Sequence, residues 1–261
     1  MSENVNNLFQ TAREDGIISP SSMNALTVMD IGEEIQNALT GNIDAMELSE
    51  VVLVTLMPDD SGSIRFEGNA QIVRDGHNLV IDALAGSKQG DSILMHTRYL
   101  NGEILFPYTN IVQAIRMDSQ NYDPRLGTPL YDQSVLLLGA VIAQAQQFID
   151  NGVAVRTVTL IITDGADAHS SRANAAMVKS IVDDMLRTED HIVAGMGIDD
   201  GYTDFKQVFQ SMGIRDEWIL TPKNSDSEIR RAFQVFSQSA VRASQNAPNF
   251  SQVAQAGAFG G

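Results

Sequence analysis

Short apolar runs along the chain alternate with longer segments in which apolar residues recur every three or four positions. An apolar run bounded by turn residues predicts a buried strand, and the longer recurrence predicts a helix with one buried face. This pattern predicts strands at 48–57, 91–100, 103–108, 155–163, 191–198 and 217–220. It predicts helices at 64–85, 128–150, 172–187, 204–212 and 225–242, with a short one at 112–117 inside the long loop 109–127.

Because strands alternate with helices, we expect an α/β fold with a doubly wound, mostly parallel, Rossmann-like sheet and helices on both faces. Asn101-Gly102, between the second and third strands, is a strong hairpin signal. One antiparallel edge strand is therefore expected on an otherwise parallel sheet.

The two ends of the chain differ in character from its middle. Residues 1–47 are expected to be an N-terminal helical extension, with one helix starting at Pro20 and ending near Gly41. This extension is expected to pack on the main domain, 48–242, or to contact a partner. Residues 243–261 are rich in Ser, Gln, Ala and Gly and predict a flexible tail.

Composition narrows the range of partners. The net charge is -16 with a pI near 4.4, so we expect neither nucleic acid nor an anionic membrane surface as a partner. A basic partner or a divalent cation fits better, although an acidic surface also simply keeps a protein soluble. Cysteine is absent, which excludes disulfides and thiolate chemistry. Without a signal-peptide pattern or a membrane-spanning run, a cytoplasmic location is expected.

Candidate chemistry lies directly after the first strand, in Asp59-Asp60-Ser61-Gly62-Ser63. Carboxylate and hydroxyl oxygens are hard ligands suited to Mg²⁺, Mn²⁺ or Ca²⁺. Ser and Asp are also the preferred residues at a helix N-cap, so these five residues alone leave both interpretations open. A metal site next to a positive helix N-terminus needs further carboxylates from elsewhere in the chain.

Two other loops carry suitable groups. Thr128 precedes Pro129, which predicts a helix N-cap followed by proline at the first helical position. Asp164 directly follows the strand 155–163. In a right-handed doubly wound sheet, the loops that follow the strands share one edge. The three loops are therefore expected to form one site.

This combination resembles the metal-ion-dependent adhesion site (MIDAS) of von Willebrand factor A (VWA) domains, whose signature is D-x-S-x-S, a distant Thr and a distant Asp. The resemblance covers 48–242 and places the metal ligands at Asp59, Ser61, Ser63, Thr128 and Asp164. It implies that the hydroxyls contact Mg²⁺ or Mn²⁺, with Ca²⁺ a poorer fit. The acids then bind directly or through water, and an Asp or Glu of a protein partner completes the shell.

The resemblance also implies a role. Bacterial intracellular VWA proteins often act as adaptors to AAA+ ATPases or in stress-response systems. We therefore expect a cytoplasmic, metal-dependent protein-interaction module and not an enzyme. The chain has no glycine-rich phosphate loop, so any ATPase must be a separate chain.

Residues around the motif raise further expectations. Asp60 stands where the family often has Gly, and Pro58 stands where an apolar residue is usual. Asp60 is expected to point to solvent, or to add charge that weakens capture of a partner carboxylate. Asp167 and His169 are expected to be surface residues, and Arg65 is near enough to pair with an acid at the rim.

Two alternatives come from other functional classes. A metal-dependent phosphatase would use Asp59 as nucleophile, but it needs a general acid two positions later, where Ser61 stands. A serine hydrolase lacks the G-x-S-x-G elbow around Ser61. A structural or self-assembling subunit, with the terminal extensions as contacts, is the third possibility.

Overall fold

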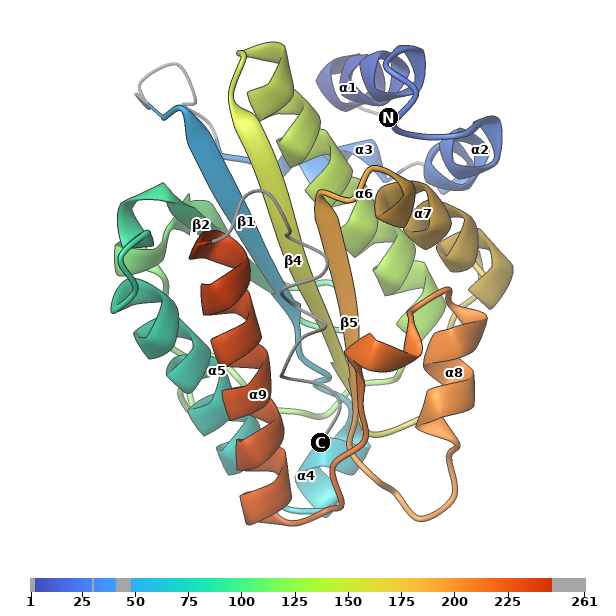
Figure 1. Ribbon diagram of the computed structural model, residues 1–261. Helices are drawn as coiled ribbons and strands as arrows, with labels where there is room; N and C mark the ends of the chain where they lie inside the picture. Colours follow the sequence, from blue (N-terminus) through green and yellow to red (C-terminus); the bar gives the residue numbers. More distant parts are fainter. Residues whose placement is uncertain (1–2, 30, 41–47, 246–261) are drawn as a thin grey trace.

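The computed structural model describes residues 3–29, 31–40 and 48–245 of the 261-residue chain. Its centre is a six-stranded sheet in the order β3-β2-β1-β4-β5-β6 (Figure 1). β3 runs antiparallel to β2, and the other neighbours are parallel, which confirms the predicted fold class. The strands are β1 (Glu50–Met57), β2 (Ile93–Arg98), β3 (Ile104–Asn110), β4 (Ala154–Thr163), β5 (His191–Gly197) and β6 (Ile219–Leu220).

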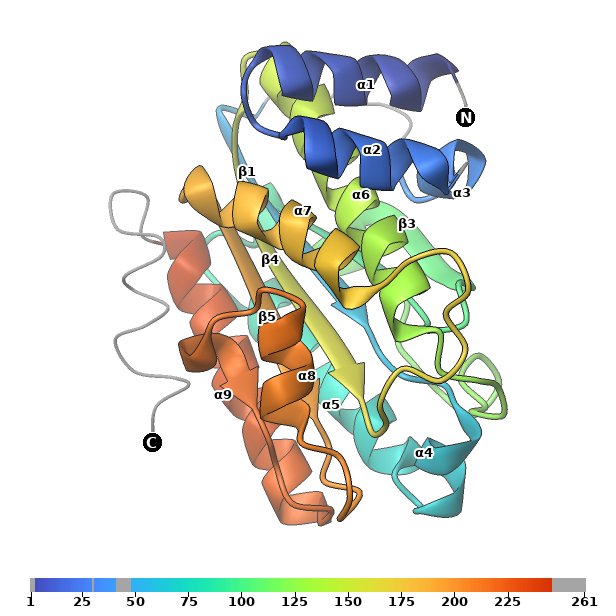
Figure 2. The same ribbon diagram turned by 90° about the vertical axis from the view of Figure 1, so that its right-hand side faces the viewer.

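Helices cover both faces of this sheet (Figures 1 and 2). α5 (Ala70–Ala85) and α9 (Asp226–Gln245) lie side by side on one face. On the other face lie α6 (Leu130–Asp150) and α7 (Ala175–Arg187), with α8 (Phe205–Ser211) against β5. Short 3₁₀ turns occupy Gly90–Ser92, Ile111–Gln113 and Asp216–Trp218. Among the described residues, no helix is long and apolar enough to cross a membrane.

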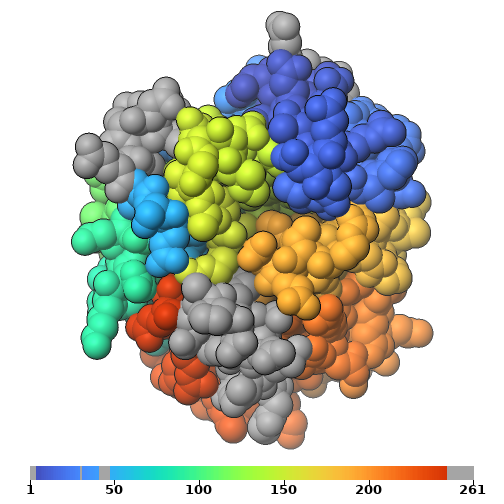
Figure 3. All heavy atoms as spheres, turned by 45° about the horizontal axis from the view of Figure 1, so that its top comes forward, coloured from blue at the N-terminus to red at the C-terminus, as the bar shows by residue number. Residues whose placement is uncertain are grey.

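The N-terminal segment forms three helices, α1 (Glu3–Glu14), α2 (Pro20–Val28) and α3 (Gly32–Gln36), where one was expected. They pack against the outer side of α6 and α7, as Figure 3 shows for α1 and α2. A Cβ on Gly139 of α6 would lie 2.9 Å from both Leu26 and Ile35, so this glycine allows the close approach. α6 is apolar on nearly all sides because these helices cover the face that the sheet does not.

The extension is thus packed against the main domain, which was one of the two expectations for it. Its apolar side chains belong to the same continuous core as the sheet. The division of the chain into three parts stays a prediction. The expected helix end at Gly41 lies outside the described residues.

Three local predictions were wrong. The single helix expected at 64–85 is two helices, α4 (Gly62–Phe66) and α5, because Gly68 adopts φ +78° between them. Phe66, an apolar residue inside the range predicted as one helix with a buried face, is consequently 88% exposed. At 112–117 only the 3₁₀ turn Ile111–Gln113 forms. The last helix, expected to end at 242, continues as α9 to Gln245, and residues 246–261 lie outside the described part.

Candidate metal centre

The candidate site lies at the carboxyl ends of β1 and β4. These strands are neighbours, and the strand order reverses between them. In open α/β sheets, ligands bind at this switch point. The D-x-S-x-S loop follows β1, and Asp164 follows β4 directly. In Figure 2, α4 lies just beyond this end of the sheet.

Asp59 is fully buried, and protein donors hold both of its carboxylate oxygens. The Ser61 amide donates to Oδ1 at 2.7 Å, and the Thr163 hydroxyl donates to Oδ2 at 2.7 Å. The Tyr122 hydroxyl donates to the Asp59 carbonyl. Burial raises the pKa of Asp59 above its ordinary value, and the hydrogen bonds from Ser61 and Thr163 to its carboxylate act in the opposite direction.

The Asp164 carboxylate receives the two serine hydroxyls of the motif. Ser63 Oγ donates to Oδ1 at 2.6 Å, and Ser61 Oγ lies 3.4 Å from the same oxygen. The two hydroxyls are 2.8 Å apart. Asp164 Oδ2 is buried and has no hydrogen-bond partner among the described residues. Burial, together with the charge of Asp59, raises the pKa of Asp164 to about 6.

Asp60 turns away from this cluster. It is buried, and its Oδ1 accepts a hydrogen bond from the Asn101 amide at 3.0 Å. The expectation that Asp60 points to solvent was therefore wrong. Burial, with a smaller contribution from the charge of Asp59, raises the pKa of Asp60 to about 7. Because the Leu100 amide donates to the Pro58 carbonyl at 3.1 Å, the turn after β2 braces the motif loop.

The segment that precedes Thr128 is tied to the motif loop. The Gly62 amide donates to the Leu126 carbonyl at 3.0 Å, and Leu126 forms a parallel bridge with Ser61. Thr128 is only 8% exposed, and its amide donates to His169 Nδ1 at 2.8 Å. Its hydroxyl makes no hydrogen bond to another described residue.

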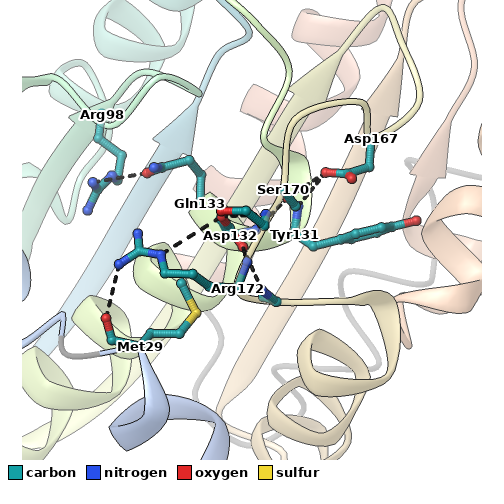
Figure 4. Close-up of polar contacts among 10 residues, drawn as sticks. Met29, Arg98, Tyr131, Asp132, Gln133, Asp167, Ser170 and Arg172 are labelled. Atoms are coloured by element: carbon teal, nitrogen blue, oxygen red, sulfur yellow. Dashed lines mark hydrogen bonds and ion pairs between the residues drawn. The ribbon is translucent and has the colours of Figure 1, made fainter.

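Thr128 does not cap α6 as predicted, because the helix begins at Leu130. A hydroxyl from a distant loop caps it instead, since the amides of Tyr131 and Asp132 donate to Ser170 Oγ at 3.0 and 2.9 Å (Figure 4). Asp167 supports Ser170 by accepting its hydroxyl at 2.5 Å. The Thr128 hydroxyl therefore stays available for another role.

Asp132 completes the link between α6 and the loop after Asp164. Its buried carboxylate accepts hydrogen bonds from three consecutive backbone amides, those of Ser171, Arg172 and Ala173. Figure 4 shows this carboxylate lying between the start of α6 and the loop. Sequence reasoning missed Thr163, Tyr122, Asp132 and Ser170 as supports of the site. The only signal was the position of Thr163 directly before Asp164.

Two surface expectations can be compared with the structure. His169 is exposed, although its ring accepts the Thr128 amide, and Asp167 is half-buried in the α6 cap. Arg65 does pair with an acid at the rim, Asp123, at 3.7 Å, with both side chains about half exposed.

The donor set is compatible with a hard divalent cation. In the described part of the chain, no three His, Cys, Asp or Glu side chains gather so as to hold a metal. A cation here would therefore depend on hydroxyls as well as on Asp59 and Asp164. Two buried carboxylates, with the Ser61 and Ser63 hydroxyls against one of them and one carboxylate oxygen unpartnered, supply such oxygens. The residues present fit the group that the sequence motif implies.

No protein-family model and no curated protein matches the chain. Solved structures do match it. The pilus adhesin SpaC from Lactobacillus rhamnosus GG, in its open conformation, aligns with a TM-score of 0.52 and 12% identity, covering 76% of this chain and 30% of that one. The vWF domain of the pilus tip protein Mfa5 from Porphyromonas gingivalis aligns with a TM-score of 0.52 and 11% identity, covering 77% and 98%.

Proximal thread matrix protein 1 from the mussel byssus aligns with a TM-score of 0.50 and 15% identity, covering 74% of this chain and 49% of that one. The match thus spans less than half of the adhesin and of the mussel protein. At these identities the matches show the fold alone. The chain has the fold of a VWA domain.

Proposed function

We propose that this chain is a metal-dependent protein-interaction module. It binds Mg²⁺ or Mn²⁺, and Ca²⁺ less well, through a complete MIDAS formed by Asp59, Ser61, Ser63, Thr128 and Asp164. The observation that carries the proposal is at Asp164, where both serine hydroxyls converge on Oδ1 while Oδ2 is buried without a partner. A buried carboxylate with an unpaired oxygen is costly, and a bound cation relieves that cost.

The same ligand set explains why the ion would attract a partner. Ser61, Ser63 and Thr128 offer neutral hydroxyls, so only Asp59 and Asp164 offset the charge of the ion. Mg²⁺ takes six oxygens in an octahedron and keeps several waters. A partner's Asp or Glu can replace one of those waters, and this exchange would make binding of the partner depend on the metal.

The geometry supports binding better than catalysis. A nucleophilic carboxylate must reach the substrate, but Asp59 is fully buried and both of its oxygens accept hydrogen bonds from the protein. The place of a general acid, two residues on, holds Ser61, whose amide supports Asp59. No contact in the described residues favours a purely structural or self-assembling role over metal binding.

The proposed location and partner of the protein rest on the sequence resemblance. We place the protein in the bacterial cytoplasm, where its partner is an acidic segment of another protein, such as an AAA+ ATPase or a component of a stress-response system. Capture of that partner should be lost in chelator. Capture that persists in chelator would move the interface away from the metal.

The metal site is tested by calorimetric titration of Mg²⁺ and Mn²⁺ into the wild type, Ser61→Ala and Asp59→Ala. We expect one saturable site in the wild type and none in either variant. Asp183→Ala is a matched control, because it removes an exposed acid on α7 and should leave the titration unchanged. Equal binding in all four proteins would show only loose attraction of cations to an acidic surface.

A further inference from the structure

Arg98, near the end of β2, carries a buried charge that the candidate metal centre does not use. Its side chain is fully buried. Nη2 donates to the Gly102 carbonyl at 3.1 Å. It also donates to Gln133 Oε1 at 3.2 Å (Figure 4). The other two nitrogens, Nε and Nη1, have no hydrogen-bond partner in the described part of the chain. Since a guanidinium has five N–H donors, most of its donors are unsatisfied.

The side chain nevertheless stays cationic at neutral pH. Burial lowers the pKa of Arg98 to about 10, while the charge of Glu34 acts in the opposite direction. Glu34 acts only from a distance, since no ion pair joins it to Arg98 in the described residues. A buried cation without a direct ion pair or full hydrogen bonding is strongly unfavourable. An anion or further hydrogen-bond acceptors next to Arg98 would therefore stabilise this side chain.

A cavity of about 360 Å³ borders this side chain, where α3 faces the turn between β2 and β3. Its volume falls within the range of small-ligand sites. Of the described residues, those that line it are Glu34, Asn37, Arg98, Gly102 and Ile104. No described residue both lines the cavity and belongs to the metal centre, although the neighbouring Asn101 amide donates to Asp60.

The lining selects the kind of anion. Ile104 offers apolar surface, Asn37 offers an amide, and Glu34 brings a negative charge to the mouth. One guanidinium beside one carboxylate, on a chain of net charge -16, disfavours a doubly charged phosphate. A singly charged carboxylate on a short apolar stem matches the guanidinium, the amide and the apolar wall.

We propose that this cavity binds a carboxylate group, which pairs with Arg98. Because Arg98 has no exposed surface, the lining side chains must part to admit the contact. The carboxylate has two chemically equivalent sources, a short-chain organic acid in solution or the acidic side chain or C-terminus of a protein. The site is independent of the metal centre and of its proposed function.

Butyrate is the probe for the first test. The Nε–H resonance of Arg98 in the ¹⁵N-labelled full chain is followed as sodium butyrate replaces sodium chloride at constant ionic strength, in chelator. We expect a saturable shift of this resonance in the wild type. An Arg98 Nε–H resonance that does not shift as butyrate replaces chloride would overturn the proposal.

Variants at the mouth separate binding from folding. Asn37→Trp places an indole at the mouth without altering Arg98, and it should weaken butyrate binding at least about tenfold. Glu34→Gln removes the competing charge and should tighten binding about threefold or more. Glu33→Gln, on the same helix but outside the lining, is the matched control and should change nothing. Arg98→Met identifies the Arg98 resonance. Even if that variant fails to fold, butyrate binding that is unchanged in Asn37→Trp would contradict the assignment.

A peptide pair then distinguishes the two sources. A short peptide ending in a free carboxylate is compared with the same peptide amidated at its C-terminus. Binding of butyrate and of the free peptide, but not of the amide, supports a protein source. Binding of butyrate alone supports a small organic acid. Binding of the amide as tightly as the free peptide would show that no carboxylate is being recognised.

Discussion

Ser63 Oγ donates a hydrogen bond to Asp164 Oδ1 at 2.6 Å, although the two residues are 101 positions apart in the chain. The contact exists because β1 and β4 are parallel neighbours, so the loops that follow them meet at one edge of the sheet. It joins the first and last parts of the candidate metal centre directly.

The first prediction concerns the response to metal. Asp59→Ala combined with Asp164→Ala should abolish stabilisation by Mg²⁺ while leaving the fold intact. A ligand at a hundred times its dissociation constant stabilises the native state by about 2.7 kcal/mol, and that increment should vanish. The free energy of unfolding is measured by denaturant titration with and without Mg²⁺. A double variant that keeps the full Mg²⁺ response would refute the assignment of these ligands.

The second prediction concerns the cost of the unmetallated site. In chelator, Asp164→Asn should match or exceed the wild type in stability by up to about 1 kcal/mol, because it removes a buried charge with an unpartnered oxygen. Asp132→Asn is the contrast. Its carboxylate accepts three backbone amides, so that variant should lose roughly 1–3 kcal/mol. Denaturant titrations in chelator measure both, and equal losses in the two variants would contradict the argument.

The sequence alone predicted the fold class, because the fold class depends on local signals that recur along the chain. Each parallel strand is an apolar run, and the Asn101-Gly102 turn marks the antiparallel edge, so the order of elements followed from periodicity. The predicted helix boundaries were wrong where the backbone conformation of a single residue ends a helix. Gly68 at φ +78° divides one periodic segment into two helices, and nothing in the apolar spacing shows that break.

The residues of the candidate site were equally visible in the sequence, but their supports were not. Asp59 and Asp164 stand at strand ends, where a motif can be recognised. Ser170 caps α6 from a distant loop, and the Asn101 amide donates to the carboxylate of Asp60. Such contacts join loops that only the tertiary fold brings together, so local patterns do not encode them. Whether the site binds a metal stays a prediction.

The third prediction concerns the N-terminal helices. Asp184 of α7 accepts hydrogen bonds from the Ser19 amide and the Ser22 hydroxyl, both at 2.6 Å. Asp184→Ala should leave both donors without this partner and cost roughly 1–3 kcal/mol of unfolding free energy. It should also speed proteolysis within α1 and α2.

The neighbouring residue provides the control for this prediction. Asp183 is about half exposed and, among the described residues, pairs with Lys179 of the same helix alone. Asp183→Ala should therefore change the stability by no more than about 0.5 kcal/mol. If the two variants were equally stable and equally resistant to protease, the N-terminal helices would not depend on Asp184 for their attachment.

The last prediction concerns acid sensitivity. His191 is buried at the start of β5, with its Nδ1 2.7 Å from the Thr157 hydroxyl, and burial lowers the pKa of its ring from 6.5 to about 4. As the pH falls below 6.5, the His191 ring binds a proton in the unfolded chain, whereas in the folded chain it binds one only near pH 4. Stability present at pH 7 is therefore lost on acidification, by about 2 kcal/mol between pH 7 and pH 5 from this group. The raised pKa values of Asp60 and Asp164 act in the opposite direction, so the comparison must be between variants.

His191→Asn keeps an acceptor near Thr157 but cannot titrate, so its stability should fall less than that of the wild type over this range. Denaturant titrations in chelator at pH 7 and pH 5 measure the difference, and equal losses in both proteins would mean that His191 is protonated in the folded state.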